Sequence, residues 1–160
     1  MSLEIKHSRP VWRRVATAAV AAGALTLAVT ANAGECPADK RVAAGAGQKP
    51  GPTTPKGVTD KVRTSIDLSK EKVAVDRLFR LRQLDIEPGG IVPWHNHAER
   101  PALIYIVKGT IVEYASTCAV PIVHKAGEVA PESHGLSHWW KNTGKTTVVL
   151  IAADLFQSGN

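Results

Sequence analysis

Residues 89–109 read GGIVPWHNHAERPALIYIVKG, and this stretch decides the expected fold. It places His95 and His97 two positions apart in a run rich in Val, Ile and aromatic side chains. Successive side chains of a β-strand point to opposite faces, so residues at i and i+2 point the same way. The stretch therefore predicts a strand that presents two imidazoles on one face, followed by a turn and a second strand that ends at Gly109.

Short apolar runs of the same texture lie on both sides of this stretch. Before it, residues 78–85 alternate between two faces and end at Pro88-Gly89-Gly90, which indicates a strand followed by a turn. After it come TIVEYAS (110–116), VPIVHKAGEVA (120–130), LSHWWKN (136–142) and TTVVLIAADLF (146–156). Many short strands joined by regular turns are typical of an all-β sandwich or barrel.

Length and composition are those of one ordinary globular domain. The chain has 160 residues, of which 44% are hydrophobic and 21% are charged. The formal charge is +6, but without residues 1–33 it falls to +3, and no basic run remains. We therefore expect no nucleic-acid partner.

The N-terminus has the pattern of an export signal. The basic residues Lys6, Arg9, Arg13 and Arg14 precede the uncharged stretch VATAAVAAGALTLAVTANAG. Ala31-Asn32-Ala33 has the small-x-small pattern that signal peptidase accepts, so residues 1–33 are interpreted as a signal peptide cleaved before Gly34. An uncleaved membrane anchor is the alternative, and Arg13-Arg14 raises the twin-arginine route. We expect a periplasmic or secreted protein with no membrane contact after cleavage.

Residues 34–57, rich in Pro, Gly, Ala and Lys, are expected to form an extended arm or linker before a barrel domain at 58–160. The two cysteines, Cys36 and Cys118, fall in different parts of this plan. In an oxidising compartment two thiols of one small domain often pair, which predicts a disulfide between the arm and the barrel. Two free thiols, with Cys118 as a buried small apolar residue, are the alternative.

A third histidine extends the pair at 95 and 97. His138 lies on a later predicted strand, and three imidazoles aimed into a barrel would chelate one metal ion with open coordination positions. An H-x-H pair alone is a weak signal, because surface or core histidines explain it equally well. The glycines around the histidines carry further information.

The sequence resembles the cupin family in two motifs. In GGIVPWHNHAERPALIYIVKG, Gly89, His95, His97 and Gly109 fall at the spacing of the first cupin motif. In GEVAPESHGLSHWWKN (127–142), the second motif is matched by Gly127, Gly135, His138 and Asn142, with Ser133 in place of the usual proline. The resemblance implies a double-stranded β-helix, or jelly-roll, barrel with metal ligands His95, His97 and His138. It also implies a possible homodimer.

One departure from the first motif concerns the metal-binding glutamate. The resemblance places that glutamate at position 102, where this chain has Ala102. Three readings stay open: a three-histidine site as in some cupin iron dioxygenases, a displaced fourth ligand at Glu99, or a degenerate site without metal.

Other residues near the motifs are weaker candidates. Arg100 is a candidate for binding a substrate carboxylate, and Tyr105 for donating a hydrogen bond. Glu99 and His134 are candidate acid–base groups, alongside Glu113 and Glu132. Each has a structural alternative: an ion pair, the barrel rim or an exposed loop. Trp94, Trp139 and Trp140 are expected to wall the pocket or to pack in the barrel, and His124 has no assigned role.

Two classes of function follow from the resemblance. The first is a small-molecule metalloenzyme, dioxygenase-like or an isomerase or lyase, with one divalent metal ion. Nitrogen ligands favour iron, with zinc, nickel, copper or manganese as alternatives. The second is a non-catalytic module that binds a metal or small ligand as a sensor, carrier or accessory protein. Sequence leaves open whether the protein is an enzyme, and which substrate it takes.

Overall fold

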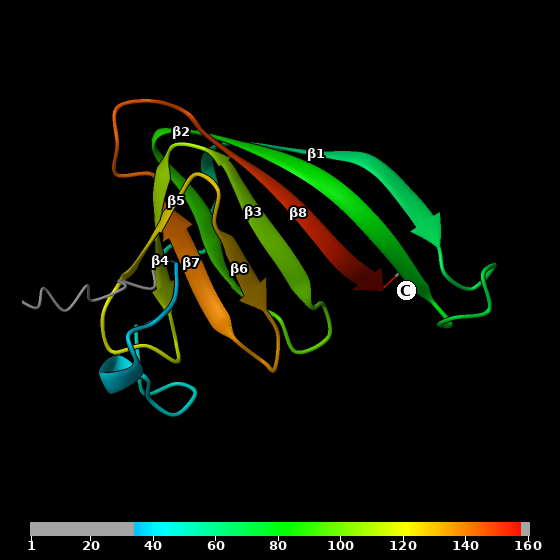
Figure 1. Cartoon of the computed structure of the whole chain (residues 1–160), viewed down its shortest axis with the longest axis horizontal. Coiled ribbons are helices and arrows are strands. Elements are labelled where there is room, and N and C mark those ends of the chain that lie inside the picture. The colour runs from blue at the N-terminus through cyan, green and yellow to red at the C-terminus, as the bar shows by residue number, and fades with distance from the viewer. Residues whose placement is uncertain (1–33, 158–160) are drawn as a thin grey trace, which may run out of the picture. The chain divides into compact units, whose positions relative to one another are not determined.

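The computed structural model describes residues 34–157, so the expected signal peptide at 1–33 lies outside the described residues (Figure 1). A short 3-10 helix, η1 (Ala38–Lys40), precedes the strands. The strands are β1 (Lys56–Asp67), β2 (Arg77–Asn96), β3 (Ala102–Lys108), β4 (Thr110–Ala115), β5 (Ile122–Lys125), β6 (Val129–Glu132), β7 (Ser137–Lys141) and β8 (Val148–Gln157). Within this range no helix is long and apolar enough to cross a membrane.

The strands form one antiparallel sheet that curls into a barrel. Their order is β5-β4-β7-β2-β8-β3-β6, with β1 paired to β2 outside this path. β5 and β6 lie at the two ends of this path and are joined by a short turn. That turn extends the β6 pairing with β3, because Ile106 donates a backbone hydrogen bond to Glu128 (3.0 Å) and accepts one from Gly127 (2.9 Å). The prediction of an all-β jelly-roll barrel is confirmed.

Strand β2 is longer than expected and bends in the middle. The strand predicted at 78–85 is present, but the turn predicted at Pro88-Gly89-Gly90 is wrong, since β2 continues to Asn96. The pairing with β1 jumps from Val58↔Ile86 to Lys56↔Ile91, so residues 87–90 form a bulge. Gly89 has φ +73°, a conformation that glycine adopts without a steric penalty. The bulge lets β2 pair with β8 before the bend and with β7 after it.

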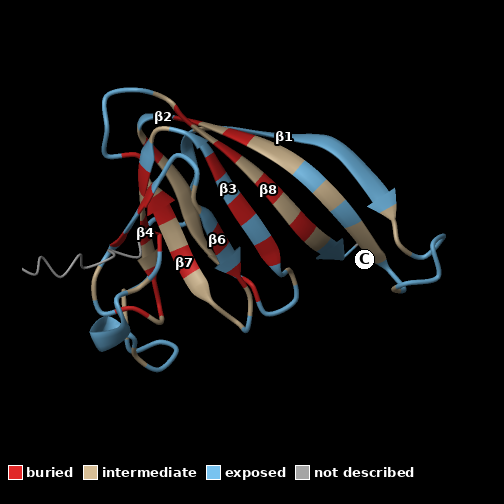
Figure 2. Ribbon diagram, viewed as in Figure 1, coloured by how far each residue is buried: buried red, intermediate tan, exposed pale blue. Residues whose placement is uncertain are grey.

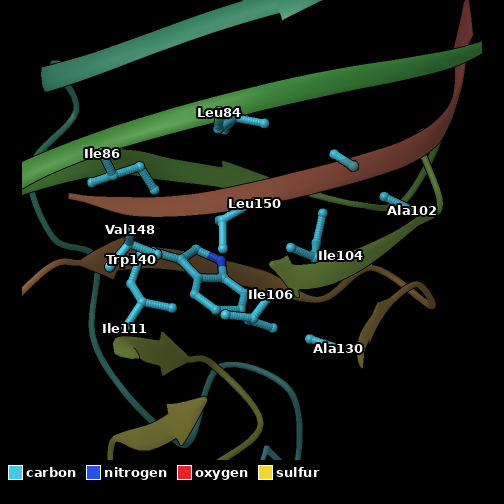
Figure 3. Packing of buried hydrophobic residues seen from close by; sticks show 11 residues of the cluster. Leu84, Ile86, Ala102, Ile104, Ile106, Ile111, Ala130, Trp140, Val148 and Leu150 are labelled. Atoms are coloured by element: carbon cyan, nitrogen blue, oxygen red, sulfur yellow. The ribbon is translucent and has the colours of Figure 1, made fainter. Parts of the chain in front are cut away.

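Alternating burial along the strands builds the core (Figure 2). On β3, for example, Ala102, Ile104 and Ile106 are buried while the residues between them are exposed. Fully burying an isoleucine stabilises a fold by roughly 1.5–3 kcal/mol, so this inner face strongly favours one register. Figure 3 shows the resulting cluster, whose members are Leu84, Ile86, Ala102, Ile104, Ile106, Ile111, Ala130, Trp140, Val148, Leu150 and Ala152.

Two residues of the cupin-like motifs have structural roles. The buried Asn142 side chain donates hydrogen bonds to the carbonyls of Ile86 (2.9 Å) and Thr146 (2.8 Å), and it accepts one from the Gly144 amide (2.9 Å). It thereby fixes the loop between β7 and β8. Gly109 has φ +89°, and a Cβ there would lie 2.9 Å from the Val148 side chain.

The segment before β1 lies against the barrel. The predicted disulfide between Cys36 and Cys118 is present, with the two Cα atoms 5.8 Å apart. Arg41 forms an isolated β-bridge with Cys118, and the Trp94 amide donates to the Pro52 carbonyl (2.8 Å). The expected arm at 34–57 is thus held by a covalent bond and by backbone hydrogen bonds.

Candidate metal centre

Four side chains converge inside the barrel: His95, His97, Glu132 and His138. One ligand atom from each lies within 4.8 Å of those of the others. His95 lies on β2, His97 directly follows that strand, Glu132 ends β6 and His138 lies on β7. Strand pairing sets this arrangement, because His95 and His138 are direct partners in the β2–β7 register.

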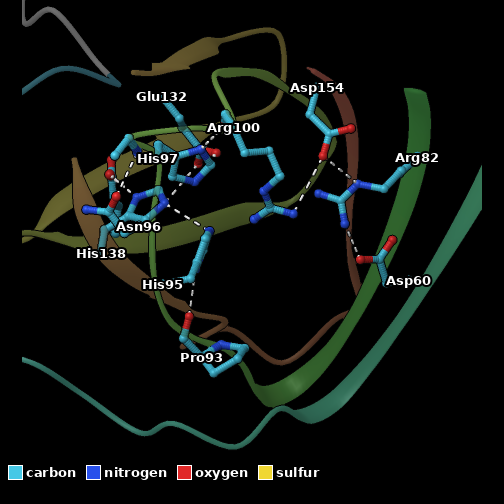
Figure 4. A network of polar contacts seen from close by, with 12 residues as sticks. Asp60, Arg82, Pro93, His95, Asn96, His97, Arg100, Glu132, His138 and Asp154 are labelled. Carbon is cyan, nitrogen blue, oxygen red and sulfur yellow. Dashed lines mark hydrogen bonds and ion pairs between the residues drawn. The ribbon is translucent and has the colours of Figure 1, made fainter. Parts of the chain in front are cut away.

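Hydrogen bonds fix the orientation of all three imidazoles (Figure 4). Nδ1 of His95 lies 2.8 Å from the Pro93 carbonyl, and Nδ1 of His97 lies 2.7 Å from the Arg100 carbonyl. Nδ1 of His138 lies 2.6 Å from Oε1 of Glu113. Carbonyls and carboxylates accept, so each Nδ1 is the protonated donor and each Nε2 carries the lone pair. Such partners orient the histidines of metal sites.

The three Nε2 atoms and the Glu132 carboxylate face one another. Nε2 of His138 lies 3.2 Å from Nε2 of His95 and 3.3 Å from Oε1 of Glu132. Nε2 of His97 lies 3.0 Å from Oε2 of Glu132, but it has no hydrogen-bond partner among the described residues. Lone pairs and a carboxylate at these separations repel one another unless a cation lies between them. The donor set therefore fits a metal ion.

Glu132 supplies the carboxylate that the sequence lacks at position 102. Ala102 and Glu132 are direct partners in the β3–β6 register, so their side chains share one face of the sheet. Both side chains are buried. The carboxylate thus reaches the site from the neighbouring strand. Sequence reasoning named Glu132 only as a possible acid–base group, and its position on the buried face of an alternating run was the available signal.

A second carboxylate, Glu113 on β4, contacts the candidate site through His138. Its Oε1 accepts a hydrogen bond from Nδ1 of His138 (2.6 Å), and its Oε2 lies 2.9 Å from Nε2 of His124. Glu113 and His124 are both buried, at 4% and 1% exposure. His124, which had no assigned role, therefore helps to hold the partner of a metal-site histidine.

This environment shifts three pKa values. Burial, with the nearby charge of His138, lowers the pKa of His95 to about 4. Burial alone would lower the pKa of His138, but the hydrogen bond to Glu113 and the charges of Glu132 and Glu113 raise it. Burial would raise the pKa of Glu113, yet its hydrogen bonds to His124 and His138 lower it to about 2. Glu113 is therefore a carboxylate at neutral pH.

Of the remaining weaker candidates, Arg100 lies beside the centre. Its side chain is half-buried and faces Asp154 on β8. Glu99 is exposed and does not belong to the converging group, so the structure does not support its reading as a displaced ligand. Tyr105 lies on the exposed face of β3, and His134 is exposed in the turn before β7.

The three tryptophans have different surroundings. Trp140 is buried in the core and borders the pocket next to His95. Trp139 stacks on Tyr114 with ring centroids 4.0 Å apart, and Gly51 of the N-terminal segment packs on its ring. Trp94 lines a groove formed with that segment. Only Trp140 therefore walls the pocket at the metal centre.

The jelly-roll barrel and its candidate site of three histidines and one glutamate agree with the resemblance to cupins. The match to known families agrees: residues 82–154 match the family model described as "Cupin domain". The chain belongs to the cupin superfamily.

Part of the chain is similar in sequence to known plant proteins. The chain is 32% identical over 76 residues to Germin-like protein 5-1 of Oryza sativa subsp. japonica, which covers 46% of this chain and 34% of that protein. It is 33% identical over 76 residues to Nectarin-1 of Nicotiana plumbaginifolia, covering 46% of this chain and 33% of the other. The chain thus matches about a third of the length of these relatives.

One solved structure resembles this one over most of the barrel. It is described as a predicted oxalate decarboxylase from Thermotoga maritima. The TM-score is 0.53 at 23% identity, and the match covers 72% of this chain and 97% of that chain. This likeness supports the fold.

Because Glu132 on β6 lies opposite Ala102 on β3, the carboxylate can be moved from one strand to the other by mutation. We expect Glu132→Ala to weaken zinc binding by at least about tenfold. Even mutations of residues that only orient metal ligands lower metal affinity by about this factor. Adding Ala102→Glu to that variant returns a carboxylate to the same face from β3, so we expect most of the affinity to return. Competition titration with a chromophoric chelator measures both.

Glu99→Ala is the matched control, because it removes an exposed carboxylate close by in sequence. Unchanged zinc affinity in Glu132→Ala would show that Glu132 is not a ligand. A folded double variant without recovery would show that position 102 does not face the site.

The hydrogen bond from His138 to Glu113 generates a pH prediction. A proton on Nε2 of His138 competes with a metal ion, so zinc affinity falls as pH drops through the raised pKa of His138. Glu113→Gln removes the charge that raises this pKa, so the fall should begin at lower pH. Zinc titrations between about pH 5 and 8 measure the onset.

His134→Gln serves as the control, since it removes an exposed histidine outside the site. An onset in Glu113→Gln that equals the wild-type onset would contradict the role given to Glu113. Circular dichroism confirms that each variant is folded.

Proposed function

We propose that this protein is a mononuclear metal-dependent enzyme that acts on a small molecule, with His95, His97, His138 and Glu132 as metal ligands. The observation that carries the proposal is the convergence of three lone-pair nitrogens and one carboxylate beside a pocket. Four protein ligands leave two positions of an octahedral ion open. A bound first-row ion would polarise a substrate carbonyl or enol as a Lewis acid.

The surrounding residues support a reaction at this point. Two of the proposed ligands, His95 and Glu132, border the pocket, together with apolar side chains that include Leu84, Val92 and Ile104. These side chains limit water access, which strengthens electrostatic interactions at the site. Nitrogen and carboxylate donors together favour iron or manganese, with zinc, nickel or copper as alternatives. Dioxygenase-like, isomerase and lyase reactions are the classes that the proposal covers.

Elemental analysis combined with turnover assays tests the proposal. We expect about one first-row metal ion per chain, lost in the His95→Ala/His138→Ala variant. The metal-loaded protein is then assayed with acetylacetone, L-cysteine and oxalate for oxygen uptake and for release of carbon dioxide. Turnover of one probe, absent in the double variant, would establish an enzyme.

Two other results would point elsewhere. A tightly bound metal without turnover of any probe would favour a binding module. Absence of metal after reconstitution with iron, manganese and zinc in turn would overturn the metalloenzyme proposal.

We also propose that the protein is exported and begins at Gly34 after processing. Two observations support this. The Cys36–Cys118 disulfide suits an oxidising compartment. Gly34 is buried, and its amide donates to the Val123 carbonyl (3.2 Å), so the folded domain includes the first residue after the expected cleavage site.

Expression of the full chain in a Gram-negative host tests the export proposal. We expect periplasmic protein whose N-terminal sequence begins at Gly34-Glu35-Cys36. Ala33→Lys should block cleavage, because signal peptidase requires a small residue there. A cytoplasmic protein that retains residues 1–33 would contradict export.

A further inference from the structure

A cluster of three guanidinium groups surrounds one buried carboxylate beside the candidate metal centre. Figure 4 shows two of them, Arg82 and Arg100, on either side of Asp154. The Asp154 side chain on β8 is 0% exposed. Its Oδ2 lies 2.7 Å from Arg80, 3.3 Å from Arg82 and 3.6 Å from Arg100. One carboxylate balances one positive charge, so the cluster needs further negative charge.

Two of the three arginines have structural partners. Arg80 binds both Asp154 oxygens, at 2.9 and 2.7 Å, and its guanidinium lies 3.7 Å from the Phe156 ring centroid. Arg82 also pairs with Asp60 of β1. These contacts tie β1, β2 and β8 together.

Arg100 differs from its neighbours. At 3.6 Å its guanidinium lies beyond hydrogen-bond distance from Asp154, and it makes no hydrogen bond to any of the residues at 34–157. Burial, followed by the charge of Arg82, lowers the pKa of Arg100. Guanidinium groups nevertheless stay protonated at neutral pH. The Arg100 carbonyl accepts from Nδ1 of His97 (2.7 Å), so its backbone is anchored to the metal centre.

A pocket connects this guanidinium to the metal centre. Its volume is about 210 Å³. It is lined by Asp60, Arg82, Leu84, Val92, Pro93, His95 and Arg100. A molecule inside it would contact a metal ligand on one side and Arg100 on the other.

We propose that Arg100, with Arg82 beside it, binds a carboxylate of the substrate, so that the pocket takes a small organic acid with a second oxygen directed at the metal centre. The statement that a second substrate oxygen is directed at the metal rests on the proposed function. Three guanidiniums against the carboxylates of Asp60 and Asp154 leave one positive charge, because the third nearby carboxylate, Glu132, is the one assigned to the metal ion. That excess matches a monoanion better than a dianion such as phosphate.

Titrations with small probes test the inference. The probes are acetate and L-lactate, with acetamide and lactamide as neutral matches, and inorganic phosphate. Arginine Nε–Hε signals in ¹H–¹⁵N NMR spectra of zinc-loaded and metal-free protein report binding at the guanidiniums. We expect the acids to bind at least about tenfold more tightly than the amides, because a charge-assisted hydrogen bond is lost with the amide.

Variants assign the effect to one residue. Arg100→Gln should weaken acid binding about 10- to 100-fold and leave amide binding unchanged. Arg63→Gln is the control, because it removes one charge from an exposed arginine that bonds Gln83 outside the pocket. Equal binding of acids and amides, no acid binding at all, or equal losses in both variants would overturn the inference. Tighter binding of phosphate than of lactate would overturn the selection for a monoanion.

Failure of this inference is distinguishable from failure of the proposed function. If zinc binds and lactate binding is unaffected by Arg100→Gln, the carboxylate site is wrong and the metal centre stands. If no metal binds, but metal-free protein binds lactate and Arg100→Gln abolishes this, the carboxylate site stands and the metalloenzyme proposal falls.

Discussion

Antiparallel register is the constraint on which the site depends. The pairing of β2 with β7 sets His95 opposite His138, and the pairing of β3 with β6 sets Ala102 opposite Glu132. A slip of one residue would turn these side chains to the opposite face of the sheet. Buried apolar residues on the same faces, Ile104 on β3 and Trp140 on β7, resist that slip. The apolar core therefore positions the candidate metal centre as well as stabilising the barrel.

The barrel buries three carboxylates, and each is compensated differently. Removing an ionised group from water costs several kcal/mol even after relaxation, so each needs partners. Glu113 has two imidazoles, and Asp154 has three guanidiniums. Glu132 faces only the Nε2 atoms of His97 and His138, whose protons are at Nδ1. A metal ion bound between these groups would supply the compensating charge.

The sequence predicted much of the fold and three of the four side chains that converge in the candidate site, His95, His97 and His138. Alternation and turn residues indicated the barrel, the H-x-H spacing placed His95 and His97 together, and the disulfide was predicted correctly. Glu132 could not be assigned, because its role depends on which residue it faces across the β3–β6 pair. The Pro88-Gly89-Gly90 turn was wrong because a bulge uses the same residues as a turn, and tertiary pairing on both sides of the bend decides between them.

The same registers explain why alanine suits position 102. Ala102 is the partner of Glu132 on one side and of Asp154 on the other, so the three positions form a row across β6, β3 and β8. A glutamate at the centre would place three carboxylates side by side at strand spacings of about 4.8 Å, where like charges repel. With a methyl group there, the outer two carboxylates serve different cations. Glu132 faces the imidazoles and Asp154 holds the guanidiniums, so a single row of partners separates the candidate metal centre from the arginine cluster that we propose as the carboxylate site.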